Sequence, residues 1–424
     1  MSSTPFNYLK TVWQSSLFKA SGIYTVASFT NAAIPFLLLP VLTRYLSHAD
    51  FGIVAMFITY TGFLMPFVGV NMEAAIARKY YSDKSEIPVY LGTCILTSLV
   101  SFAIVLSTVY VLKGMLSTYT GLPSDWILYG VVLAFFQFMV LVVSTLFQVK
   151  VKPFHYGVFQ VSQSAINFGL SLVFIIYLGM NWEGRLDAQL SSSVLFGLIA
   201  IIILVYKREL RWRFNPRFAR HAVKFGAALI PHALGALVLM YTMRFFILHF
   251  AGMDKLGLFS VAAQVSSILG FFTLSFNNAF VPWLYRKLNE NNELTKKKVV
   301  KLTYTYFAAI SISGVVFYFL TPLIFRFLIN KSFWSAAEYV PLVITGYVFQ
   351  GMYFMVTNYI TYVEKTWYQA IVTMVVGLCN IPTCYFLTKA YGLQGAAGSF
   401  AIAFFLLFVF TWAVSSRLYK MPWR

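Results

Sequence analysis

Long apolar runs separated by short polar breaks are the dominant pattern along this chain. A transmembrane helix needs about 20 predominantly apolar residues, and runs of that length recur about twelve times here. The first six runs cover residues 20–43, 51–72, 87–112, 126–148, 156–178 and 190–206, and the second six cover 225–250, 257–282, 302–328, 339–361, 367–388 and 393–414. The pattern predicts an all-α membrane protein with about twelve transmembrane helices.

Three pairs of these predicted helices are joined by very short connections, at 44–50, 251–256 and 389–392. Each pair could instead be one long helix. The first connection contains Ser47 and Asp50 and the second contains Gly252 and Asp254, which are residue types that favour turns or carry charge. We therefore predict that each pair is split into two helices.

Lysine and arginine are distributed unevenly between the two sides that the predicted helices define. If the N-terminus is cytoplasmic, 24 of the 32 Lys and Arg residues fall in cytoplasmic segments, seven fall in or beside the opposite loops, and Arg244 lies within a helix. Basic residues concentrate on the cytoplasmic side of membrane proteins, so we predict that both termini are cytoplasmic. Basic residues at the headgroups also explain most of the +19 net charge, without nucleic acid as a partner.

The composition excludes an ordinary soluble protein. Only 11% of the residues are charged, 59% are hydrophobic and the mean hydropathy is +0.74, whereas about 25% charged residues is usual for a soluble domain. The sequence has no phosphate-binding glycine loop and no zinc-ligand spacing, and its three cysteines lie in apolar runs. We therefore expect a transporter without catalytic residues, metal or cofactor, and not an enzyme.

A basic segment divides the predicted helices into two sets of six. It covers residues 207–224, so the expected organisation is a lobe at 1–206, a basic cytoplasmic linker at 207–224 and a lobe at 225–424. Six helices per half means that both halves enter the membrane from the same side, which is the parallel-repeat arrangement of transporters. Each half also places a glycine, Gly52 or Gly257, at the start of its second helix. We expect two six-helix lobes around a central cavity.

Arg244 is the clearest candidate for a functional residue, since it lies within an apolar helix about six residues from the predicted outer end. A guanidinium at the centre of a bilayer costs about 2.5–3.5 kcal/mol on insertion scales. One hypothesis is that Arg244 faces the cavity and binds an anion such as phosphate, for which its planar fork of donors is suited. The alternative is that it reaches the outer interface, roughly 9 Å away.

Three charged residues near the inner end of the second predicted helix have two interpretations each. Glu73 is a candidate proton or coupling-ion site, because burial raises the pKa of a carboxyl group, or it is a solvated acid beside a loop. Arg78 and Lys79 are candidate contacts for a substrate phosphate, or they simply belong to the cytoplasmic basic residues.

The remaining candidates are single polar residues within or at the ends of helices. Arg44 ends the first predicted helix after two prolines that would bend it, and is either a substrate contact or an interface anchor. His232 could titrate near neutral pH or form a packing hydrogen bond. Amide side chains that either line the cavity or join helices are Asn31, Gln264, Asn277 and Asn278.

Two stretches of the sequence carry a family resemblance. Residues 39–46, LPVLTRYL, followed by Asp50-Phe51-Gly52, resemble the start of bacterial polysaccharide flippases of the Wzx type, in the multidrug/oligosaccharidyl-lipid/polysaccharide (MOP) exporter superfamily. Residues 244–282, with LGLFS at 256–260 and a proline at 282, look like the helix seven to eight region of that family. The family often has an acid directly before this arginine, whereas this chain has Met243.

The resemblance implies a substrate, partners and a location. The substrate would be an undecaprenyl-pyrophosphate-linked oligosaccharide, such as an O-antigen repeat unit, moved from the cytoplasmic to the periplasmic leaflet of the bacterial inner membrane. Partners would be the lipid bilayer and other polysaccharide-assembly proteins, such as a polymerase or a chain-length regulator. Relatives suggest coupling to a proton or sodium gradient. In this interpretation alternating access rocks one lobe against the other.

Two other functions remain open from the sequence. A multidrug cation antiporter shares the architecture of the superfamily, but it is expected to place acids rather than arginines in mid-membrane, and only Glu73 lies near such a position. A membrane glycosyltransferase or ligase of polysaccharide synthesis would usually carry a large periplasmic loop, whereas the outer loops at 113–125 and 179–189 are short. A sodium-coupled solute symporter is a third class.

Overall fold

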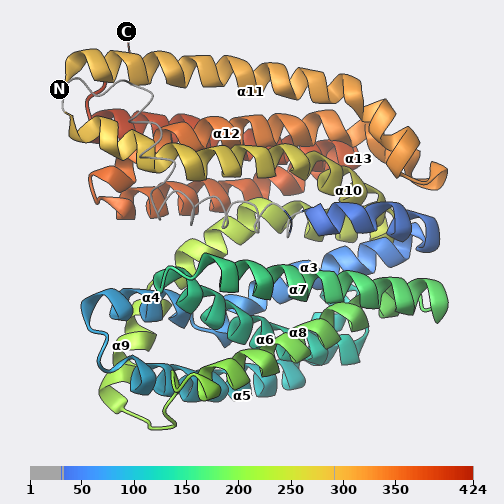
Figure 1. Cartoon of the computed structure of the whole chain (residues 1–424). Helices are drawn as coiled ribbons and strands as arrows, with labels where there is room; N and C mark the ends of the chain where they lie inside the picture. The colour runs from blue at the N-terminus through green and yellow to red at the C-terminus, as the bar shows by residue number, and fades with distance from the viewer. Residues whose placement is uncertain (1–29, 31–32, 291, 424) are drawn as a thin grey trace. The chain divides into compact units, whose positions relative to one another are not determined.

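The computed structural model describes residue 30, residues 33–290 and residues 292–423, and this part of the chain is helical without any β-strand (Figure 1). The predicted all-α class is therefore confirmed for the described residues. After a helix at Ala33–Tyr45 the elements are α3 (His48–Val68), α4 (Met72–Ser82), α5 (Ile87–Thr120), α6 (Ser124–Val149), α7 (Pro153–Leu172), η1 (Val173–Tyr177), α8 (Trp182–Tyr206), α9 (Pro216–Ala227), α10 (Ile230–Asn289), α11 (Glu293–Leu328), η2 (Lys331–Tyr339), α12 (Val340–Tyr362) and α13 (Thr366–Leu418).

Nine helical segments within the described residues are long and apolar enough to cross a membrane. Two of them each combine two predicted spans, because α10 and α13 continue through a kink. The kinks lie at Gly252, with φ 82° and ψ 176°, and at Gly392, with φ 59° and ψ −135°. Backbone with positive φ favours glycine. The predicted splits at 251–256 and 389–392 are confirmed, as is the split at 44–50, where one helix ends at Tyr45 and α3 begins at His48.

Several predicted helix boundaries are wrong. α5 ends at Thr120 rather than 112, α10 ends at Asn289 rather than 282, and α11 begins at Glu293 rather than 302. The sixth span, predicted at 190–206, begins at Trp182, so most of the predicted outer loop at 179–189 is helical. The second span, predicted at 51–72, ends at Val68, because Val70 and Asn71 adopt positive φ values of 49° and 45°. The chain turns there and starts a separate helix, α4, which carries Glu73. Residues 20–29 of the first predicted span lie outside the described residues.

The chain forms two compact units. Among the described residues we call them the N-terminal unit, which comprises those up to Leu38, Phe57–Thr118 and Leu122–Ile230, and the C-terminal unit, which comprises those in Leu39–Met56, Tyr119–Gly121 and 231–423. The chain passes between the units within the helix at Ala33–Tyr45, within α3, on either side of Tyr119–Gly121 and at the start of α10. The division into two six-helix lobes at 1–206 and 225–424 stays a prediction.

In the N-terminal unit the basic segment after α8 is fixed along the first turns of α5. The backbone N–H of Arg211 donates to the carbonyl of Pro88 at 2.9 Å. A Cβ on Gly92 would lie 1.9 Å from the carbonyl oxygen of Arg211, so only glycine allows this approach. The segment then enters α9, where Asn215 caps the helix by accepting from the N–H of Arg217. The predicted linker is therefore packed structure.

In the C-terminal unit the two glycines noted in the sequence meet at one backbone contact between α3 and α10. A Cβ on Gly257 would lie 1.7 Å from the carbonyl oxygen of His48, and a Cβ on Gly52 would lie 2.3 Å from that of Met253. The imidazole of His48 lies beside this contact, with Nδ1 3.5 Å from the carboxylate of Asp254. The glycines thus allow two membrane-spanning helices to touch through their backbones.

Substitution tests this contact. We expect Gly257→Ala to lower the melting temperature of the purified protein by several degrees, because the added methyl group meets a backbone oxygen and overpacking costs about 1–3 kcal/mol. Gly114→Ala is the matched control, since its Cβ would meet nothing within 4 Å. Thermal unfolding in detergent measures both variants. Equal melting temperatures for the two variants would contradict the assigned role of Gly257.

Candidate functional site

Arg244 lies in α10, inside the C-terminal unit, and its side chain is half-buried. Its Nη1 donates to the carbonyl oxygen of Ala55 in α3 at 2.8 Å. The guanidinium carbon lies 4.8 Å from the centre of the Tyr241 ring, within the range of a cation–π interaction. The phenol of Tyr347, in α12, lies within electrostatic range. These three contacts are with neutral groups, and they hold the guanidinium in place.

The local sequence explains how three helices frame this guanidinium. Tyr241 precedes Arg244 by three residues, which places both on one face of α10. Tyr347 is buried against Gly270, where a Cβ would lie 2.6 Å from its ring, and it makes an edge-to-face contact with Phe400. The carbonyl of Ala55 lies one turn beyond the close approach at Gly52. The geometry is suited to holding an anion through a pre-positioned cation.

Three other predicted residues of the C-terminal unit differ from Arg244 in burial. Arg44, in the last turn of the helix at 33–45, is exposed, and so are His232 near the start of α10 and Asn278. Asn277, the residue before Asn278, forms a hydrogen bond inside the unit: Asn358 of α12 donates to its side-chain oxygen at 2.9 Å. Asn31 lies outside the described residues.

In the N-terminal unit Glu73, Arg78 and Lys79 share the short helix α4. Arg78 is exposed and lies 5.6 Å from the ring centre of Phe225. Lys79 lies 3.1 Å from the carboxylate of Asp83 and 3.4 Å from that of Glu86, so its charge is already balanced. Asp83 has a lowered pKa because Ser85 and Lys79 donate hydrogen bonds to its carboxylate.

Glu73 differs from its neighbours because it is half-buried in the first turn of α4. Burial raises the pKa of its carboxyl group above the usual value, and a hydrogen bond with its own backbone opposes this shift only in part. A carboxyl group with a raised pKa can exchange a proton closer to neutral pH. The role of Glu73 as a proton site stays a prediction.

A polar seam between α7 and α8, which the sequence analysis missed, also lies in the N-terminal unit. Arg185 of α8 donates through Nη1 to Asn167 Oδ1 at 2.7 Å and to Ser171 Oγ at 3.2 Å. The sequence signal was a repeat of polar residues within an apolar helix, at the helical spacing of one face. The residues of this repeat on α7 are Gln160, Gln163, Ser164, Asn167 and Ser171. Asn167 and Ser171 contact α8, whereas Gln160 donates to Ser144 of α6.

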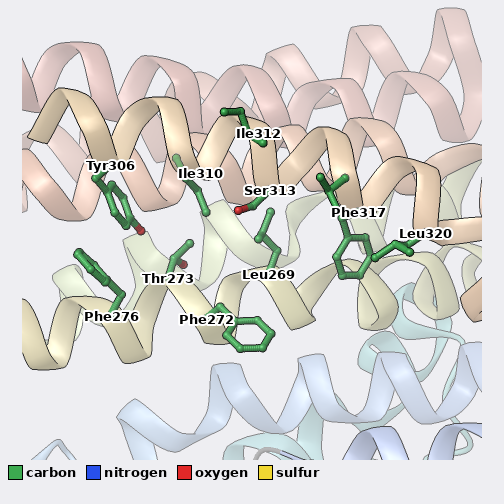
Figure 2. Close-up of a pocket in the computed structure, with 11 residues that line it drawn as sticks. Leu269, Phe272, Thr273, Phe276, Tyr306, Ile310, Ile312, Ser313, Phe317 and Leu320 are labelled. Atoms are coloured by element: carbon green, nitrogen blue, oxygen red, sulfur yellow. The ribbon is translucent and has the colours of Figure 1, made fainter.

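An open groove between α10 and α11 holds about 500 Å³ (Figure 2). Its lining is apolar apart from three hydroxyl groups, those of Thr273, Tyr306 and Ser313. The figure shows Phe272, Phe276 and Phe317 along the same groove. Since both helices are long enough to span a membrane, bilayer chains suffice to fill this surface. It therefore identifies no substrate by itself. Within the described residues no three His, Cys, Asp or Glu side chains are grouped to hold a metal ion.

Comparison with known proteins shows the family and the fold. The model of the family described as "Polysaccharide biosynthesis protein" matches residues 17–288, and that of MatE matches residues 228–386. An "Uncharacterized membrane protein" of Haemophilus influenzae is 26% identical over 360 residues, which cover 83% of this chain and 85% of that protein.

Two solved structures share the fold. The lipid II flippase MurJ, in an inward closed conformation, matches with a TM-score of 0.74 and 16% identity, over 92% of this chain and 86% of that one. An outward-facing multidrug resistance MATE family transporter of the MOP superfamily matches with a TM-score of 0.67 and 16% identity, over 94% and 95%. At these identities the likeness shows the fold alone.

The raised pKa of Glu73 predicts how the stability of the fold depends on pH. The folded protein holds this proton more tightly than the unfolded chain, in which the pKa is about 4.3. Glu73 therefore destabilises the fold increasingly as the pH rises through the interval between the two values. We expect wild type to lose more thermal stability than Glu73→Gln over that interval. Glu293→Gln, at an exposed carboxylate, controls for the loss of one charge. Parallel pH curves for wild type and Glu73→Gln would refute the assignment.

Proposed function

Because this chain belongs to the polysaccharide biosynthesis protein family, a family of membrane transporters and flippases, we propose that it flips a lipid-linked oligosaccharide across the membrane. The substrate in this proposal is an undecaprenyl-pyrophosphate-linked repeat unit of a surface polysaccharide such as O-antigen. It moves from the cytoplasmic to the periplasmic leaflet of a bacterial inner membrane by alternating access. The MurJ likeness supports the class of substrate, since MurJ is named as a lipid II flippase.

The single observation that carries the proposal is Arg244, a guanidinium that a backbone carbonyl and an aromatic ring position inside a membrane-spanning helix. Its Nη1 bonds to the Ala55 carbonyl and its face lies against Tyr241. A pyrophosphate carries its charge through a layer where bare charge is prohibitive. A fixed arginine can replace part of the hydration of the pyrophosphate with two parallel hydrogen bonds, and it stays charged at every physiological pH.

The remaining predicted residues have secondary roles in this proposal. Arg44, Asn278 and Arg78 are exposed, which leaves them accessible to a headgroup or glycan. Glu73 is the candidate proton site for coupling, since burial raises the pKa of its carboxyl group. A proton or sodium gradient would then drive transport, and polymerase or chain-length proteins would receive the product.

A second candidate is multidrug cation export, which the MatE match over residues 228–386 and the MATE fold support. The charge of Arg244 argues against it, because a fixed positive charge repels a cationic drug. A cation exporter would raise resistance to cationic compounds when expressed in a sensitive host. A flippase for anionic lipids leaves resistance unchanged.

Complementation in the native host tests the proposal. Deletion of the gene should abolish the surface polysaccharide and cause lipid-linked intermediates to accumulate, and wild type should reverse both effects. We expect Arg244→Ala to reduce polysaccharide at least tenfold at equal protein level, and Arg244→Lys to retain part of the activity because it keeps the charge but not the fork.

The matched control is Arg326→Ala, which removes an exposed arginine of α11. We expect it to complement fully. Normal polysaccharide in a deletion strain that has no second flippase would refute the proposed function. Full complementation by Arg244→Ala would refute the role of Arg244 and leave the function standing.

A further inference from the structure

Arg185 is a positive charge fixed inside the N-terminal unit by neutral side chains. It lies in the first turn of α8, and its Nη1 donates to Asn167 and Ser171 of α7. Neither acceptor carries a charge. Arg185 takes part in none of the ion pairs among the described residues, which are the Lys and His pairs with Asp and Glu. The guanidinium therefore keeps its full charge where it is held.

No ion pair joins Arg185 to a carboxylate in the part of the chain that the structure describes. The acids closest in sequence, Glu183 and Asp187, are two residues away on either side of Arg185. Residues two apart on a helix do not face each other, so these acids point away from the α7 contact. The segments outside the described residues contain no Asp or Glu at all.

The geometry of the guanidinium leaves donors for a ligand. The described hydrogen bonds of Arg185 use Nη1 alone. An arginine has five N–H donors in a planar fork, and Nε with Nη2 forms the side-on pair that binds carboxylate or phosphate. Asn167 and Ser171 fix one edge of this fork and so orient the other edge.

A second, independent observation lies one helical turn further along α8. The Oε1 of Gln189 is buried and accepts no hydrogen bond among the described residues. Residues four apart are neighbours on one helix face, so Gln189 adjoins Arg185. Buried acceptors are normally satisfied. An oriented cation beside an unsatisfied acceptor matches a ligand that carries an anion next to a hydroxyl group.

From these two observations we propose that Arg185, Asn167, Ser171 and Gln189 form an oxyanion subsite for a carbohydrate bearing a carboxylate or phosphate. The anion accepts from Arg185, and a sugar hydroxyl donates to Gln189. The subsite rests on the proposed function, since it assigns to the transported glycan an acidic sugar or a glycosyl phosphate. Both sources offer the same chemistry, and the choice of probes separates them.

Asn167→Asp is the sharpest variant because it places a carboxylate on the guanidinium without removing a contact. The purified full-length protein is titrated by calorimetry with methyl glucuronide, glucose 1-phosphate and, as a neutral control, methyl glucoside. We expect wild type to bind at least one anionic probe and not methyl glucoside. In Asn167→Asp we expect affinity to fall at least tenfold, about 1.4 kcal/mol, with no loss of thermal stability. Arg185→Gln should lose binding likewise.

Gln148→Glu is the matched control, since it adds the same charge at an exposed position of α6 in the same unit. It should bind as wild type does. A preference for the glucuronide assigns the subsite to an acidic sugar, and a preference for glucose 1-phosphate assigns it to the glycosyl phosphate. No binding of either probe by wild type, or equal binding by folded Asn167→Asp, would overturn the proposal.

Transport by the same variants separates this inference from the proposed function. If Arg244→Ala abolishes flipping while Asn167→Asp flips and binds as wild type does, the subsite is refuted and the flippase stands. The reverse result is that wild type flips no lipid-linked glycan but binds the anionic probe, and Asn167→Asp does not bind it. The flippase is then refuted and the subsite stands. A purely structural Arg185 would gain or keep activity when its charge is paired, so lost transport in stable Asn167→Asp supports the subsite.

Discussion

The hydrocarbon interior of a bilayer requires every polar group in a spanning helix to be held by the protein itself, and charged groups above all. In the described contacts of this chain, neutral oxygens and aromatic rings hold two such arginines. Arg244 bonds to the Ala55 carbonyl and lies against Tyr241, and Arg185 bonds to Asn167 and Ser171. Neutral acceptors orient a guanidinium. In the proposed function these two side chains contact an anionic substrate.

Close helix packing places the groups that hold Arg244. Gly257 and Gly52 let α10 and α3 touch through their backbones, and the Ala55 carbonyl lies one turn beyond that contact. Gly270 similarly admits the ring of Tyr347. Small residues at helix contacts are a general means of association in membranes. Here they also set the surroundings of a charged side chain, so packing and the proposed function depend on the same glycines.

The apolar runs predicted nearly all the spanning helices, and the turn residues predicted the kinks at Gly252 and Gly392. Hydropathy misplaced the start of α8, because a polar first turn resembles a loop, and Arg185 was thereby assigned to a loop. Arg244 stood out as the lone basic residue of an apolar helix, but its contact with Ala55 joins residues 189 positions apart. Asn277, not Asn278, makes the partly buried pair with Asn358. Adjacent helical residues point about 100° apart, and the sequence alone does not tell which one faces inward.

Reconstitution tests the central claim, that this chain flips a lipid-linked anionic glycan, most directly. Purified protein is placed in liposomes with a fluorescent undecaprenyl-pyrophosphate oligosaccharide, and the fraction accessible to a membrane-impermeant quencher is followed over time. We expect wild type to expose the inner-leaflet lipid to the quencher and Arg244→Ala to do so at least tenfold more slowly, at equal insertion. The contrary result is that, under an imposed proton or sodium gradient, the inner-leaflet lipid stays as protected in wild-type liposomes as in protein-free liposomes. That result would contradict the flippase function.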